Sequence, residues 1–133
     1  MINQQRLVIH YFYEEMGMKQ NNVIVDKSKA FAIRIIRMHK YLNREKKEYI
    51  LSKQIMRSGT SIGANVKEAS RAFSKPDFYT KMGIALKEAS ETEYWLELLH
   101  ETEYLTNRQF DSMYADCQEL IKLLMAISRS KNN

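Results

Sequence analysis

Residues 57–70 read RSGTSIGANVKEAS, and the conformation of this run decides the fold class. It holds Gly59 and Gly63, two of only four glycines, between flanks with helical periodicity. A phosphate-binding loop would need Lys-Ser or Lys-Thr after the glycines and a strand before them, and both are missing. Gly59-Thr-Ser61-Ile-Gly63 matches the Gly-x-Ser-x-Gly pattern of hydrolases, yet that turn also requires a preceding strand. A helix explains the run better.

Glycine in a helix interior costs roughly 1 kcal/mol relative to alanine, so two glycines predict a compensating role in packing. The residues that form a belt without bulky side chains are Ser58, Gly59, Ser61, Gly63 and Ala64. We expect a second helix, from the same subunit or another, to cross this belt at short distance. A leucine at position 63 should therefore disrupt packing or assembly.

Apolar residues recur at steps of three and four residues in four segments, as they do in packed helical bundles. The second segment, about residues 48–73, has the seam Leu51, Ile55, Ser58, Ile62, Asn65, Ala69 and Ala72. The first, from Asp26, has Phe31, Ile35, Met38 and Leu42. The third has Phe78, Met82, Ala85, Ala89, Thr92, Leu96 and Leu99, and the fourth has Phe110, Tyr114, Cys117, Ile121, Leu124 and Ile127.

Two helix starts have clear capping signals. SKPD at 74–77 offers Ser74 or Asp77 as the cap and places the single proline where its missing N–H costs nothing. Thr106 and Gln109 have the spacing of a capping box. Because the connections are short, we predict an all-α fold, an antiparallel up-down-up-down four-helix bundle over residues 23–130. Residues 1–22, with a break at Asn21-Asn22, are expected to be an N-terminal extension, disordered or from a misassigned start.

Composition narrows the function classes. The chain has 133 residues, which indicates one domain, and its single cysteine excludes an intramolecular disulfide. No apolar run approaches the roughly 18 residues of a membrane span, so we expect a cytoplasmic protein without membrane contact. Residues 1–73 carry 14 Lys/Arg and 6 Asp/Glu, a balance of +8, whereas residues 74–133 carry 7 and 10, a balance of −3.

Such an uneven charge suits a nucleic acid or an acidic partner. The nucleic-acid-binding candidates on the first two helices are Arg34, Arg37, Lys40, Arg44, Lys46, Lys47, Lys53 and Arg71. The alternative is a protein-interaction scaffold without nucleic-acid binding, in which the basic half of one subunit docks on the acidic half of another. Aromatic residues near one bundle end, Tyr94, Trp95, Tyr104 and Phe110, could stack bases, although core or interface packing is the commoner use.

Other polar groups were considered for chemistry. Asn65, Glu68, Lys87 and Glu91 would meet across an antiparallel helix pair, and we interpret them as a polar cluster that fixes helix register rather than as catalytic carboxylates. Glu97-x-x-His100 is one half of a di-metal motif, but the second half is missing. We therefore predict a non-enzymatic protein with no metal, no cofactor and no catalytic residue.

RSGTSIGANVKEA, SKPDF and KMGIALKEASETEYWLELL together resemble the small bacterial four-helix-bundle proteins encoded by intervening sequences in 23S rRNA genes. The resemblance runs from about Val25 to Ile127. It implies a left-turning bundle assembled as a homo-oligomer, with a pentamer favoured, and members of the family are presumed to contact RNA.

The same fold family includes the accessory protein of diversity-generating retroelements, which is similar to a five-subunit barrel with a basic surface. That relation implies RNA or DNA as a ligand and a reverse transcriptase as a partner. MKQNNVIVDKS, which begins at Met18, is similar to a family start, so residues 1–17 are expected to be an upstream extension or to come from a misassigned start.

Overall fold

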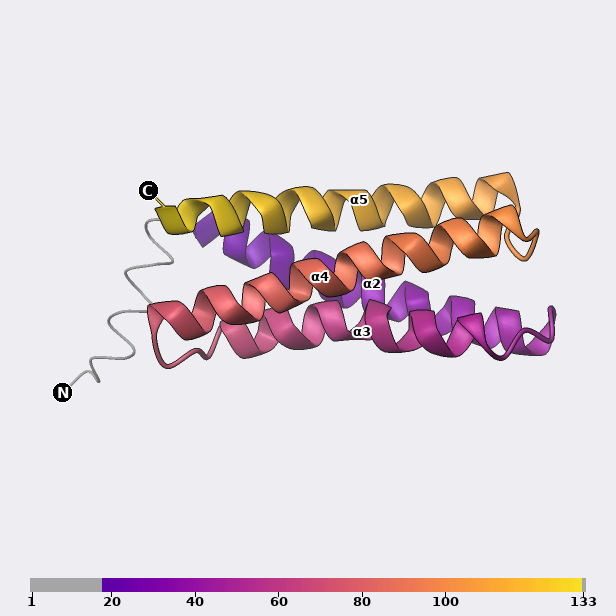
Figure 1. Cartoon of the computed structure of the whole chain (residues 1–133), viewed down its shortest axis with the longest axis horizontal. Helices are drawn as coiled ribbons and strands as arrows, with labels where there is room; N and C mark the ends of the chain where they lie inside the picture. The colour runs from indigo at the N-terminus through magenta and orange to yellow at the C-terminus, as the bar shows by residue number, and fades with distance from the viewer. Residues whose placement is uncertain (1–17, 133) are drawn as a thin grey trace.

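The computed structural model describes residues 18–132, with side chains from Val23 onward. Four long helices follow one another, α2 (Met18–Arg44), α3 (Leu51–Ala69), α4 (Lys75–Glu101) and α5 (Asn107–Arg129), and a short 3₁₀ helix, η1 (Ser130–Asn132), ends the described part. Successive helices run in opposite directions and are joined by short connections at alternate ends (Figure 1). The predicted all-α up-down-up-down four-helix bundle is confirmed.

The first helix is longer than predicted. α2 begins at Met18, so Asn21 and Asn22 lie inside a helix and the predicted break there is wrong. Asparagine is a weak helix former but costs only up to about 0.7 kcal/mol relative to alanine, which does not end a helix by itself. The side chain of Ile24, one turn further on, is fully buried and ties this part of α2 to the bundle. The rest of the predicted extension, residues 1–17, lies outside the described residues.

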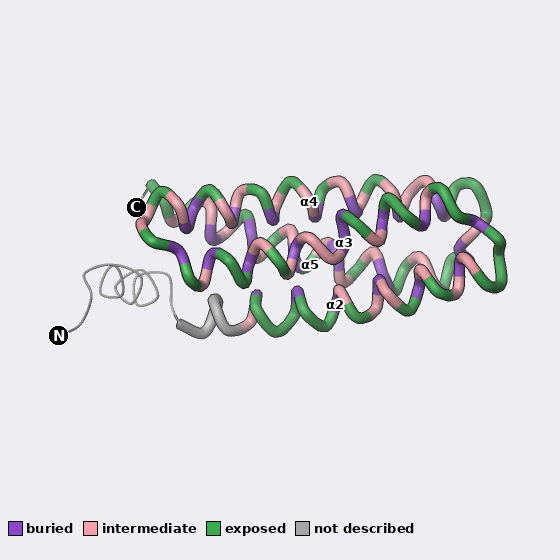
Figure 2. The backbone as a smooth tube through the Cα atoms, turned by 90° about the horizontal axis from the view of Figure 1, so that it is seen from below, coloured by how far each residue is buried: buried purple, intermediate pink, exposed green. Residues whose placement is uncertain are grey.

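The core follows the predicted seams closely in α2 and α4. All the seam residues predicted there are buried, namely Phe31, Ile35, Met38, Leu42, Phe78, Met82, Ala85, Ala89, Thr92, Leu96 and Leu99. Figure 2 shows the buried positions turned inward along the four helices. The seam of α5 is only partly correct, because Met113 and Leu120 occupy inner positions while Phe110, Tyr114 and Ile121 are half-buried. Phe110 instead stacks on His100, with ring centroids 4.2 Å apart.

The glycine belt packs against α2, as the close-packing prediction requires. A Cβ atom built on Gly59 would lie 2.7 Å from Cγ1 of Ile35, and one on Gly63 would lie 3.3 Å from the carbonyl oxygen of Ser28. Gly83 differs, because nothing lies within 4 Å of its Cβ position. The neighbour that crosses the belt is thus a helix of the same subunit.

The starts of α3, α4 and α5 are capped, one of them by a residue that the sequence did not single out. The Ser74 hydroxyl accepts from the Asp77 N–H, and Thr106 with Gln109 forms the full capping box, as predicted. At the start of α3 the buried carboxylate of Glu48 accepts hydrogen bonds from the backbone N–H groups of residues 50, 51 and 52, at 3.1, 3.0 and 2.7 Å. α3 consequently starts at Leu51, after the expected residue 48.

Candidate nucleic-acid interface

Six of the eight predicted nucleic-acid contacts gather at one corner of the bundle. Arg37, Lys40 and Arg44 are exposed on α2 at spacings of three and four residues, which places them along one stripe of the helix. Lys46 and Lys47 in the α2–α3 connection and Lys53 in the first turn of α3 are exposed at the same end of the bundle. We call these six residues the basic corner.

No cation of the basic corner forms an ion pair with a carboxylate in the part of the chain that the structure describes. The ion pairs among the described residues involve Lys27, Arg34, Arg57 and Lys81, and none includes a residue of the corner. The backbone of Lys47 is left-handed, with φ 53°, so the connection turns sharply between the two helices. Six positive charges, against the two carboxylates of Glu45 and Glu48 in the same connection, leave a net positive surface that attracts polyanions.

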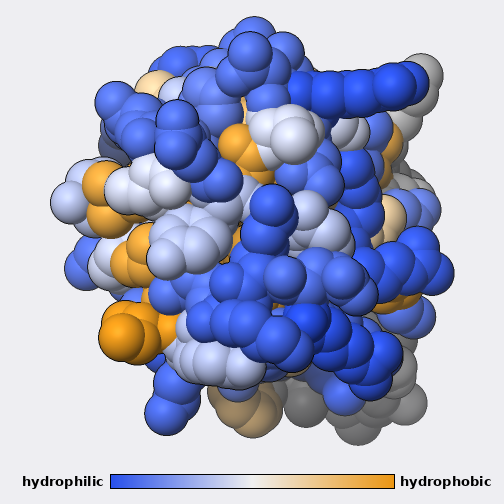
Figure 3. All heavy atoms as spheres, turned by 90° about the vertical axis from the view of Figure 1, so that its right-hand side faces the viewer, coloured by the Kyte–Doolittle hydropathy of each residue, from blue (hydrophilic) through white to orange (hydrophobic). Residues whose placement is uncertain are grey.

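Large exposed side chains lie beside these cations. Tyr49 is 58% exposed and Ile50 is 76% exposed, and both belong to the α2–α3 connection. The bundle end that carries this connection is otherwise mostly hydrophilic, with isolated hydrophobic groups (Figure 3). An exposed aromatic ring among cations is the arrangement that single-stranded nucleic acids bind by stacking.

Two predicted contacts do not belong to the corner. The Arg34 guanidinium is bound to α5, where it pairs with the Asp116 carboxylate and donates to the Ser112 hydroxyl at 2.7 Å. Arg71 follows α3 at the opposite end of the bundle. There it lines a separate groove of about 490 Å³ between α2 and α3, together with Lys29 and Lys67. The predicted basic face therefore divides into two separate surfaces at opposite ends of the bundle, because α2 and α3 both span its length.

The predicted polar cluster does not form as one unit. The Asn65 amide donates to the Ser61 carbonyl of its own helix at 2.8 Å, and Glu68 lies 3.8 Å from Lys81. Glu91 pairs with Arg57, while Lys87 is exposed. Asn65 was placed on the seam by its spacing, but the helix turns Val66 inward instead.

A different pair provides the buried polar contact between α3 and α4. The hydroxyl oxygens of Ser58 and Thr92 lie 2.8 Å apart, and both side chains are fully buried. Both residues stand on predicted seams, so their meeting could have been found from the register of an antiparallel pair. Such a contact favours one register because a shift would separate the buried Ser58 hydroxyl from its partner, whereas Thr92 would keep its hydrogen bond to the Glu88 carbonyl of its own helix, at 2.8 Å.

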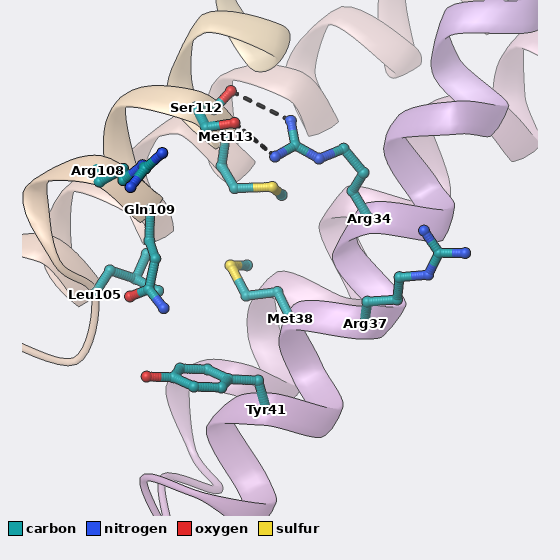
Figure 4. Close-up of a pocket in the computed structure, with 9 residues that line it drawn as sticks. All are labelled: Arg34, Arg37, Met38, Tyr41, Leu105, Arg108, Gln109, Ser112 and Met113. Atoms are coloured by element: carbon teal, nitrogen blue, oxygen red, sulfur yellow. Dashed lines mark hydrogen bonds between the residues drawn. The ribbon is translucent and has the colours of Figure 1, made fainter.

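A cleft opens between α2 and α5, next to the basic corner. It has a volume of about 450 Å³, and Met38, Leu105 and Met113 supply its apolar surface. Met38 and Met113 point toward each other across it, and the Tyr41 ring lies to one side (Figure 4). Three arginines, Arg34, Arg37 and Arg108, also line the cleft. The sequence did not indicate it, because its two walls are some 70 residues apart in the chain.

The residues considered for catalysis or metal binding are engaged elsewhere. The Ser61 hydroxyl donates to the Arg57 carbonyl of its own helix, at 2.7 Å. His100 bonds to Asn107, and Glu97 accepts from the Tyr114 hydroxyl. Among the described residues, no group of three or more His, Cys, Asp or Glu side chains is placed to hold a metal ion.

The single cysteine is equally unsuited to chemistry. Burial, reinforced by the carboxylates of Glu93, Asp116 and Glu97, raises the pKa of the Cys117 thiol from 9.0 to about 12. A thiol with so high a pKa holds its proton at neutral pH and is a poor nucleophile. In the part of the chain that the structure describes, no helix has the length and apolarity to span a membrane.

The fold is that of an all-α four-helix bundle protein, and comparison with known proteins identifies its family. The family model described as 23S rRNA-intervening sequence protein matches residues 20–126, so the chain belongs to that family. A crystal structure of a protein of unknown function from the S23 ribosomal protein family of Bacteroides thetaiotaomicron VPI-5482 is 55% identical. The match covers 83% of this chain and 98% of that chain, with a TM-score of 0.82. No curated protein matches significantly.

Proposed function

We propose that this protein is a non-enzymatic, oligomeric helical-bundle module that binds RNA or another nucleic acid through the basic corner. The observation that carries the proposal is the set of six exposed cations without an ion-pair partner among the described residues. Phosphate contacts from Lys and Arg supply most of the affinity in sequence-independent binding. The family description refers to intervening sequences of 23S rRNA, which makes structured RNA the first ligand to test.

Charge separation across the bundle supports assembly into an oligomer. The chain up to residue 73 has a balance of +8, and the chain after it a balance of −3. A contact between the basic side of one subunit and the acidic side of the next is heterologous, and repeated contacts of this kind close into a ring when the rotation permits. Exposed apolar side chains on α4, such as Ile84 and Tyr94, are available for the same contact. The resemblance favours five subunits.

RNA binding is tested by titrating a structured RNA at about 50 and 200 mM salt. We expect binding that weakens steeply with salt, because each neutralised phosphate contributes a slope of about −0.9 in log K against log salt on a duplex. A triple variant, Arg44→Gln, Lys46→Gln and Lys47→Gln, should lower that slope by about 2 to 3. The matched control removes three exposed cations from the far end, Lys122→Gln, Arg129→Gln and Lys131→Gln. Absence of binding at the lower salt, or equal losses in both triples, contradicts the proposal.

The charge separation also favours a second function, a protein-interaction scaffold that does not bind nucleic acid. Light scattering combined with the RNA titration separates the two, since the scaffold forms a stable oligomer that is indifferent to RNA. A monomer at micromolar concentration would contradict both. A reverse transcriptase partner stays a prediction from the resemblance.

A further inference from the structure

The cleft between α2 and α5 has an apolar and aromatic lining, which the basic corner lacks. Its apolar surface comes from Met38, Leu105 and Met113, which are otherwise buried. The Tyr41 ring lies along one side, and the Arg34–Ser112 contact lies at the other (Figure 4). The result is a space bounded by thioethers and an aromatic ring. Methionine sulfur makes favourable contacts with aromatic rings, so a flat ring is the chemical group that this surface fits.

Charged groups lie at the mouth of the cleft on both helices. Arg37 is exposed on α2 and Arg108 is exposed on α5, and neither forms an ion pair with a described residue. Arg34 is already neutralised by Asp116, and so it serves as a wall rather than as an anion site. Two free guanidinium groups flanking an apolar surface complement a ligand with a flat ring and a phosphate, since guanidinium matches phosphate geometry.

A polar group inside the cleft is also available. The Gln109 side-chain oxygen accepts from the Thr106 N–H in the capping box, at 2.9 Å. This contact holds the amide in place and leaves its N–H donors for another acceptor. A ring with acceptor atoms on its edge would satisfy them, whereas a plain hydrocarbon chain would not.

We propose that this cleft binds one nucleotide unit, with the base against Met38, Met113 and Tyr41 and the phosphate on Arg108. The volume of about 450 Å³ falls within the range of about 300–1,000 Å³ for small-ligand sites. The proposal deepens the nucleic-acid function and rests on it, because the cleft adjoins Arg37 of the basic corner. The ligand chemistry is that of a nucleoside 5′-phosphate, either free or at the end of a strand.

The test uses the full chain with ¹³C-methyl-labelled methionine, and the two cleft signals are assigned with Met38→Leu and Met113→Leu. A base stacked on the thioethers shifts these methyl resonances through its ring current. We expect adenosine 5′-monophosphate at millimolar concentration to shift both signals and to leave the exposed Met125 signal, on the far part of α5, in place. Ribose 5-phosphate should not reproduce the shifts. No shift with the nucleotide, or an equal shift with ribose 5-phosphate, overturns the proposal.

Variants locate the site without unfolding the bundle. Arg108→Gln removes one exposed guanidinium at the mouth, and the nucleotide Kd should rise roughly tenfold, as for the loss of one charge-assisted hydrogen bond. Arg129→Gln is the matched control, with the same charge change at the other end of α5, and should leave the Kd unchanged. Equal effects of the two variants would show that only net charge matters and would overturn the proposal.

RNA probes answer two questions. They show whether the cleft binds a free nucleotide or a strand end, and whether the cleft proposal can fail while RNA binding by the basic corner holds. A short RNA with a 5′-phosphate is compared with the same RNA bearing a 5′-hydroxyl group. Tighter binding and larger methyl shifts for the phosphorylated strand assign the cleft to strand ends, whereas shifts with the free nucleotide alone assign it to free nucleotides. If RNA binds with the predicted salt slope but neither methyl signal moves with any probe, the cleft proposal fails while the basic corner stands.

Discussion

The closeness of α2 and α3 predicts different effects of the same substitution at two glycines. Gly59→Ala would place a methyl group 2.7 Å from Cγ1, 2.9 Å from Cδ1 and 3.0 Å from Cγ2 of Ile35. Ile35 is fully buried and β-branched, so it cannot swing away without moving its own neighbours. Gly83→Ala adds the same methyl group to α4 where nothing lies within 4 Å.

The two substitutions share one contribution and differ in another. Each replaces a helical glycine, which should stabilise the fold by about 1 kcal/mol. Only Gly59→Ala also overpacks the core, at a cost of about 1–3 kcal/mol. Gly83→Ala should thus raise the free energy of unfolding by about 1 kcal/mol. The free energy of unfolding of the Gly59→Ala variant should be about 1–3 kcal/mol lower than that of the Gly83→Ala variant. At about 4 °C per kcal/mol, the two Tm values should differ by about 4–12 °C.

The assay is urea and thermal unfolding followed by circular dichroism, with all variants at one protomer concentration because assembly would otherwise shift Tm. The double variant Ile35→Ala/Gly59→Ala supplies the internal check. Ile35→Ala removes the clashing atoms, so the alanine at position 59 should stabilise that background by about 1 kcal/mol. The reasoning is refuted if Gly59→Ala melts as high as Gly83→Ala, or if its effect is the same in both backgrounds.

Three further results are expected. Gly63→Leu should lower the free energy of unfolding by about 1–3 kcal/mol in urea titrations, because its Cβ would lie 3.3 Å from the Ser28 backbone oxygen and the helices would have to separate; a native melting temperature and mass would contradict this. Glu48→Ala removes the acceptor of three backbone N–H groups and should cost about 1–2 kcal/mol, whereas Glu45→Ala, on an exposed neighbour, should cost under about 0.5 kcal/mol in the same titration. Because the pKa of Cys117 is raised from 9.0 to about 12, the folded thiol stays protonated while the unfolded one ionises, so stability should fall by about 1 kcal/mol between pH 9 and 10. Cys117→Ala should remove that slope between about pH 9 and 10, and an unchanged slope would refute the burial effect.

Much of the fold could be read from local patterns. The seams of α2 and α4 were predicted residue by residue, because side chains three and four positions apart share one face of any helix. The caps at Ser74 and Thr106 were predicted because they depend on hydrogen bonds within four residues. The Glu48 cap was missed, since a glutamate in a charged connector has the same sequence signal whether it is exposed or buried.

The candidate site was less accessible to sequence reasoning. Arg34 and Arg37 are both cations on one helix, yet only the first reaches Asp116 on α5. Arg71 looked equivalent to Lys53, but the length of α3 separates them. The polar cluster around Asn65 was wrong for a related reason, because the inward-facing position after Ile62 is four residues on, at Val66, rather than three, and Asn65 is left half-buried.

By itself, the sequence determined the helical class, the number of long helices, two of their caps and the uneven charge, since each depends on composition or on contacts within a few residues. The tertiary structure alone decided which cations lack an ion-pair partner among the described residues. It also decided that the hydroxyl groups of Ser58 and Thr92 are in contact, that the Ile35 side chain packs on Gly59, and that a cleft forms between α2 and α5. These features join residues from different helices, and their geometry depends on the rotation and separation of whole helices. Periodicity states which face of a helix turns inward, but packing of the neighbouring side chains sets the angle and the distance at which two such faces meet.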